Sequence, residues 1–132
     1  MDIPNRYDKH GNRVPYLKRD VINYVCDEFD IEPHCIEFIT ARMIKITVGD
    51  QTIWRLWDTD IVIWDRYAGI VHLDSGGWKG PFTKQMMNTI FRENFLNLGV
   101  FQKAHQWYVT TKRGDLDFED DMSIHLQEGV AV

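Results

Sequence analysis

The chain has 132 residues, 44% of them hydrophobic and 13% aromatic, and a formal net charge of −5. This length predicts one domain with its own core, and the acidic balance disfavours nucleic acid as a partner. The sequence has no run of about 18 apolar residues and no apolar signal-peptide segment near Met1. We therefore expect no membrane contact and a location in the cytoplasm.

The first part of the chain predicts an arm followed by a helix. Residues 1–15 are polar and contain Pro4, Gly11 and Pro15, which is typical of an extended N-terminal arm ahead of a single domain at 16–132. Apolar side chains then recur at every fourth position and predict a helix with one core-facing side: Leu17, Val21, Val25 and Phe29. Pro33 ends this segment.

Residues 36–73 predict a series of short strands. Ile44, Ile46 and Val48 alternate with polar residues, and Gly49-Asp50 suits a two-residue hairpin turn. Further β-prone segments follow, with breaks at 58–60 and 65–69: 52–57, 61–64 and 70–73. Short strands at this spacing favour an antiparallel β-meander.

A second helix is predicted from about Lys84 to Leu98, with Thr83 as its N-cap and Gly99 in a left-handed position at its end. The segments 100–102 and 107–110 predict a hairpin, and 116–126 is expected to add a strand or two. The predicted fold class is α+β, an antiparallel β-meander or sandwich-like sheet with two α-helices.

The segment from Trp54 to Trp57 places large side chains on both faces of its strand. Trp54 and Leu56 share one face, and Arg55 and Trp57 share the other. Since a sheet that is apolar on both faces needs covering on both, this pattern favours a homo-oligomer. The alternative is a monomer with both helices on one face and the C-terminal strands on the other.

We find no catalytic or metal-binding pattern in the sequence. Cys26 and Cys35 fit two reduced thiols better than a metal site with His34. The histidines lack metal-ligand spacing, and Ser75 lacks the frame of a hydrolase nucleophile. The acidic residues between 115 and 121 are interpreted as a solvated edge. We therefore expect no enzyme activity, no cofactor and no metal.

The densest turn signal is the segment 74–81, which contains Gly76-Gly77-Trp78 and precedes a helix. Backbone N–H groups in a glycine-rich turn before a helix can bind phosphate. A tight turn without any ligand is the simpler alternative.

About half of the chain, from Asp58 to Val109, resembles a group of small proteins encoded by tailed bacteriophages and prophages. The similarity lies in a motif of Ser-Gly-Gly-Trp at 75–78, then Thr83-Lys84 and Asn88, with Gln106-Trp107-Tyr108-Val109 later. Asp74, Lys79-Gly80 and Met87 depart from the group's pattern, which has Asn, Arg-Thr and a basic residue there.

Within that group the chain resembles the anti-Thoeris proteins, oligomeric sponges that capture cyclic ADP-ribose-type immune signals without degrading them. The resemblance implies a phage protein in the host cytoplasm that binds a small cyclic nucleotide and counters host defence. Aromatic rings, cations and amides suited to such a ligand define the predicted site: Trp78, Lys79, Phe82, Thr83, Lys84, Asn88, Arg92 and His105. The alternative function is an acidic interaction module whose partner is a host nuclease, polymerase or CRISPR effector.

Overall fold

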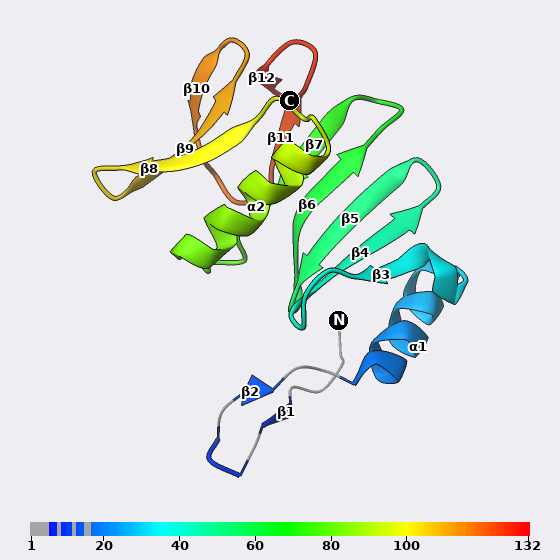
Figure 1. The fold of residues 1–132 in the computed structure, drawn as a ribbon. Helices are drawn as coiled ribbons and strands as arrows, with labels where there is room; N and C mark the ends of the chain where they lie inside the picture. Colours follow the sequence, from blue (N-terminus) through cyan, green and yellow to red (C-terminus); the bar gives the residue numbers. More distant parts are fainter. Residues whose placement is uncertain (1–5, 8, 12, 15–16) are drawn as a thin grey trace.

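The computed structural model describes residues 6–7, 9–11, 13–14 and 17–132 (Figure 1). The predicted N-terminal arm is therefore described only in part. There, β1 (Arg6–Tyr7) and β2 (Arg13–Val14) pair as a two-stranded antiparallel sheet. The rest of the expected arm lies outside the described residues.

The centre of the fold is a seven-stranded sheet in the order β12-β11-β7-β6-β5-β4-β3, with every neighbouring pair antiparallel. Its strands are β3 (Ile36–Phe38), β4 (Met43–Val48), β5 (Gln51–Leu56), β6 (Thr59–Asp65), β7 (Ile70–Leu73), β11 (Met122–His125) and β12 (Val130–Ala131). The predicted meander is confirmed, and Gly49 takes the positive φ of 57° that the β4–β5 turn requires.

A second sheet has the order β10-β9-β8 and consists of β8 (Gly99–Lys103), β9 (Gln106–Thr111) and β10 (Gly114–Asp117). The predicted hairpin at 100–110 is the β8–β9 pair. Ala104 and His105 form its tip with φ values of 50° and 66°, as a tight two-residue turn requires. The α+β fold class with antiparallel sheets is thus confirmed.

The helices α1 (Lys18–Phe29) and α2 (Pro81–Glu93) cover opposite faces of the large sheet (Figure 1). On the α1 face, Val21 and Val25 pack with apolar residues of β4 and β5: Ile44, Ile46 and Ile53. On the other face, α2 and the second sheet share a core with the alternate residues Met43 and Trp54. The alternative that put both helices on one face is wrong, because α1 packs on Ile44 and Ile53, whereas α2 shares a core with their neighbours Met43 and Trp54, which point to the other face.

The structure corrects both ends of the second helix. The helix starts at Pro81 after Gly80, so Thr83 lies inside the first turn and is buried rather than acting as the N-cap. Pro81 suits the first helical position because its missing N–H would have no partner there. The helix ends at Glu93, where Phe95 and Asn97 take positive φ, whereas Gly99 already pairs with Thr110 in β8.

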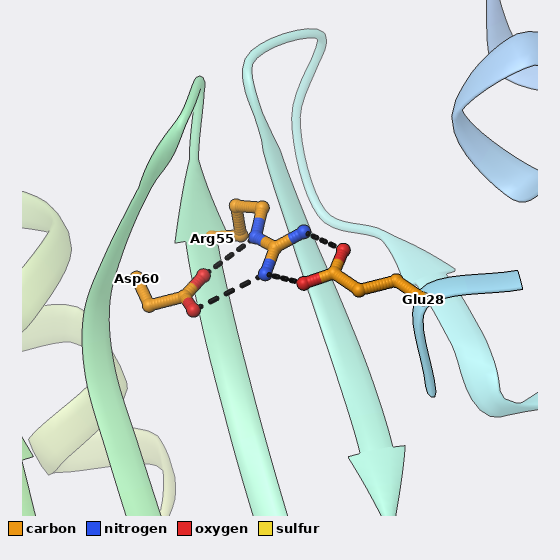
Figure 2. Close-up of polar contacts among 3 residues, drawn as sticks. All are labelled: Glu28, Arg55 and Asp60. Carbon is orange, nitrogen blue, oxygen red and sulfur yellow. Dashed lines mark hydrogen bonds and ion pairs between the residues drawn. The ribbon is translucent and has the colours of Figure 1, made fainter. Parts of the chain in front are cut away.

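Arg55 ties α1 to the large sheet (Figure 2). The Arg55 side chain is only 4% exposed, and it donates hydrogen bonds to both carboxylate oxygens of Glu28 on α1 and of Asp60 on β6. Burial alone would lower the pKa of Arg55, but these two carboxylates raise it above its ordinary value. The guanidinium therefore stays charged and fixes the position of α1 against β5 and β6.

Candidate ligand pocket

A hollow of about 320 Å³ lies between the Gly-Gly-Trp turn, the start of α2 and the ends of β5 and β6; we call it the Trp78 pocket. Its lining residues come from four segments of the chain: Leu56, Trp57, Thr59, Ile61, Ser75, Gly77, Trp78, Lys79, Gly80, Phe82 and Thr83. Four of the eight predicted site residues, Trp78, Lys79, Phe82 and Thr83, are among them.

The Trp78 pocket has an apolar floor and aromatic sides. Leu56 and Ile61 are buried, whereas Trp78 is 71% exposed and Phe82 is 38% exposed. An indole that is mostly in water beside an apolar floor presents a free ring face. This arrangement suits a flat ring, which can stack on Trp78 or Phe82 while covering the floor.

Asp120, from the loop between β10 and β11, holds the turn that carries Trp78. Its carboxylate accepts hydrogen bonds from the Ser75 amide at 2.8 Å and the Ser75 hydroxyl at 2.6 Å. The Ser75 hydroxyl oxygen in turn accepts from the Gly77 N–H, and the Ser75 carbonyl accepts from the Trp78 N–H. Burial raises the pKa of Asp120, but these bonds and the charge of Lys79 lower it overall below its ordinary value.

Gly76 allows the turn to lie directly against β6. Its φ is +63°, and a Cβ there would collide with the Thr59 side chain. Both the backbone conformation and the close contact therefore require glycine. The turn is rigid before any ligand arrives, which lowers the entropy cost of binding.

The electrostatics of the Trp78 pocket favour an anion. Among the described residues that line it, Lys79 is charged and none is acidic. Asp120 lies behind Ser75 and offsets part of the Lys79 charge, but Ser75 already occupies its Oδ1 with two hydrogen bonds. Gly80, Phe82 and Thr83 belong to the N-terminal end of α2, which no described side chain caps. The free N–H groups and the helix dipole at such an end attract negative charge.

The other four predicted site residues lie outside the pocket. The Asn88 side chain donates to the Val100 carbonyl at 2.9 Å and accepts from the Val100 N–H at 2.8 Å, so it joins α2 to β8. Lys84 donates to Gln102 and lies over the Trp107 ring. Arg92 is exposed in the last turn of α2, and His105 is exposed at the β8–β9 tip.

Sequence reasoning missed several residues that build the pocket: Leu56, Trp57, Thr59, Ile61, Ser75 and Asp120. Asp120 and Ser75 are 45 positions apart, so no local spacing connects them. Trp57 has a φ of 54°, a conformation that is rare for a bulky residue. The sequence predicts Trp57 as the last residue of a strand that shares a face with Arg55, whereas β5 ends at Leu56.

In the described part of the chain no cluster of three His, Cys, Asp or Glu side chains has the arrangement of a metal site. Cys26 and Cys35 are free and half-buried. None of the helices in the same residues has the length and apolar character needed to cross a membrane. The arrangement supports recognition of a ligand by stacking and charge.

The comparisons with known proteins place this fold in a phage family. The family model described as Kyanoviridae Gp96 protein matches residues 37–125, which is about two thirds of the chain. The matched region runs from β3 to β11 and contains the whole Trp78 pocket, but not α1. No curated protein and no solved structure matches the chain. The chain belongs to the Kyanoviridae Gp96 protein family, a family of phage proteins.

Proposed function

We propose that this phage protein is a non-enzymatic binding protein whose Trp78 pocket takes a small nucleotide, and that it acts in the host cytoplasm as a sponge for a cyclic ADP-ribose-type immune signal. The observation that carries the proposal is the exposed Trp78 ring beside Lys79 at the uncapped start of α2. A base stacks on the ring, and the phosphate meets Lys79 and the helix N–H groups.

The size of the pocket limits how the ligand sits. Small-molecule sites usually measure roughly 300–1,000 Å³, so a hollow of about 320 Å³ lies at the small end. It has room for one base with its ribose. The rest of a cyclic dinucleotide-like ligand then lies over the rim, between Lys79 and the first turn of α2. Binding therefore depends more on Trp78 and on charge than on deep enclosure.

Uptake followed by heat release tests this function. The purified protein is incubated with cyclic ADP-ribose isomers and with cyclic oligonucleotides, filtered, and then denatured by heat. We expect an intact cyclic ADP-ribose-type ligand to leave solution with the protein and to return unchanged on heating. Uptake of none of these nucleotides would exclude the sponge, and recovery of a degraded ligand would show an enzyme.

One observation favours a second candidate, an acidic surface that binds a host protein. Four carboxylates surround a hollow of about 370 Å³ next to the β5–β6 turn: Asp58, Asp60, Asp74 and Asp121. Asp60 is paired with Arg55 from behind, and Asp121 lies 2.8 Å from His72 Nε2, so Asp58 and Asp74 supply most of the acidic character. Such a surface can imitate nucleic acid toward a host nuclease or polymerase. Reversing the exposed Asp58 and Asp121 to Lys would abolish inhibition of such a target and leave nucleotide uptake unchanged.

A further inference from the structure

A second hollow, of about 400 Å³, lies between the start of α1, the loop 39–42 and β5; we call it the Arg42 pocket. Trp57 lines both this hollow and the Trp78 pocket. Its lining residues are Lys18, Val21, Phe38, Ile39, Thr40, Ala41, Arg42, Met43, Ile44, Arg55 and Trp57. Lys18 and Val21 lie outside the region matched by the family model, and the other lining residues lie inside it.

The floor of the Arg42 pocket is apolar and fixed. Val21 and Ile44 are at most 7% exposed, and Phe38 packs with the same α1-side core. Arg55 also reaches this floor, but Glu28 and Asp60 neutralise it with bidentate hydrogen bonds (Figure 2). Arg55 therefore supplies a rigid, flat wall, and not the charge that would hold an anionic group.

The rim of the Arg42 pocket supplies that charge. Lys18 and Arg42 are both exposed, and the described lining contains no acidic residue. The Lys18 Nζ lies 5.1 Å from the centre of the Phe38 ring, and the Arg42 guanidinium lies 5.8 Å from that of Phe82. Phe38 lines the Arg42 pocket, whereas Phe82 lines the Trp78 pocket, so Arg42 lies at the edge between the two hollows. A ring contact orients a cation without neutralising it.

The loop that carries Arg42 is already shaped. The Thr40 hydroxyl oxygen accepts hydrogen bonds from the N–H groups of Arg42 and Met43, both at 3.0 Å. The Arg42 carbonyl accepts from the Trp57 N–H at 2.8 Å, which links the loop to the β5–β6 turn. A binding site whose mouth is preformed loses little entropy when a ligand enters.

From these contacts we infer that the Arg42 pocket is a second binding site, and that it takes an amphipathic anion. The apolar body of the ligand lies on Val21, Phe38 and Ile44, and its carboxylate or phosphate meets Lys18 and Arg42. A free organic acid and the head of an anionic lipid share this chemistry. The inference does not depend on the function proposed for the Trp78 pocket.

Fluorescence titration of the full chain with the naphthalene sulfonate probe ANS tests the site. The neutral analogue N-phenyl-1-naphthylamine has a similar apolar body without the charge. We expect ANS to bind more tightly than the neutral probe. The double variant Lys18→Glu/Arg42→Glu should weaken ANS binding on the order of tenfold, because two attractive charges at the mouth become repulsive. The matched control Lys103→Glu/Lys112→Glu changes two exposed lysines far from the pocket and should leave binding unchanged.

A second variant addresses the apolar part. Ala41 is exposed and lines the pocket, so Ala41→Phe fills the mouth without disturbing the core and should abolish the ANS binding that remains in a Trp78→Ala background. Trp78→Ala should leave the Arg42 site intact, which separates it from the nucleotide site. Equal binding of both probes, or binding unaffected by Ala41→Phe and by the charge reversal, would overturn the inference. Competition by decanoate identifies a free acid as the ligand, and competition by phosphatidylglycerol vesicles alone identifies a lipid head.

Discussion

At the scale of single residues, the Gly-Gly-Trp turn is set by two side chains far away in sequence. Thr59 leaves no space for a Cβ at Gly76, and Asp120 accepts two hydrogen bonds from Ser75. The glycines predict the turn from the sequence alone. They do not predict Thr59 or Asp120 as its partners, because residues far apart in the chain share no sequence spacing that would reveal their contact. Rigidity in this turn is what positions Trp78 for a ligand.

Gly76→Ala is expected to destabilise the domain by about 2–3 kcal/mol, because overpacking against Thr59 adds to the strain of a positive φ. Gly77 has a φ of +84° and no atom within 4 Å of an added Cβ. Gly77→Ala should therefore cost only about 1 kcal/mol. Urea unfolding of both variants measures the difference, and equal losses would show that the Thr59 contact is unimportant.

Asp120 is expected to make stability depend on acidic pH. Since its folded pKa lies below the unfolded value near 3.8, its contribution is complete above that value and is lost as the pH falls through the folded pKa. Asp120→Asn should lower the melting temperature at pH 7 and flatten its decline below about pH 4. Asp115→Asn, at an exposed position that contacts Thr110, serves as the control. Parallel melting curves for wild type and Asp120→Asn would contradict this role.

At the scale of elements, sequence periodicity predicted the strands and α1 well, because those patterns follow directly from which face is buried. The ends of α2 were predicted poorly. Thr83 looked like an N-cap, but Pro81 at the first helical position sets the start. Gly99 looked like a helix end, but its pairing with Thr110 draws it into β8. Tertiary pairing overrode the local preference there.

Arg55 on β5 is hydrogen-bonded to α1 and to β6 at the same time. Arg55→Met should destabilise the domain by about 3 kcal/mol, because it leaves Glu28 and Asp60 close together without a compensating charge. Adding Glu28→Gln to Arg55→Met should recover part of that loss. Chemical unfolding of the two single variants and the double variant provides the cycle. Additive losses would show that the guanidinium and the Glu28 carboxylate are not coupled.

Asn88 joins α2 to the first strand of the second sheet. Asn88→Ala should cost about 2–3 kcal/mol, because the partly buried N–H and C=O of Val100 both lose their partner. Thr89→Ala, on the same helix, offers a matched control. Thermal unfolding measures both variants. A loss of ligand uptake in Asn88→Ala without a loss of stability would instead return Asn88 to the ligand site.

At the scale of the whole molecule, both faces of the large sheet are covered by the chain's own elements. The sequence pattern had favoured a second subunit as the cover. Within one chain, α1 covers β4 and β5 on one face, and α2 with the second sheet covers the other. The apolar residues of the Trp54–Trp57 segment are thus largely covered without a second subunit. A homo-oligomer stays a prediction, and its strongest basis is now the exposed Trp78 and Phe82.

The fold class and the membership of a phage protein family follow from the sequence, while the pocket itself does not. Trp78, Lys79, Phe82 and Thr83 are adjacent in the chain, so a motif could identify them together. Leu56 and Ile61 come from strands whose pairing creates the floor. Only the folded chain brings that floor under the Trp78 ring, and this juxtaposition is the basis of the proposed binding.

The most direct test of the central claim is isothermal titration of a cyclic ADP-ribose isomer into wild type, Trp78→Ala and Phe95→Ala. Phe95 is 92% exposed and lies outside the pocket, so Phe95→Ala is a control that also removes an exposed ring but leaves the pocket unchanged. We predict that Trp78→Ala lowers the affinity on the order of tenfold or more, since stacking of a base on an aromatic ring contributes about 1–3 kcal/mol, and that Phe95→Ala binds like wild type. Equal affinity of Trp78→Ala and wild type would contradict the account.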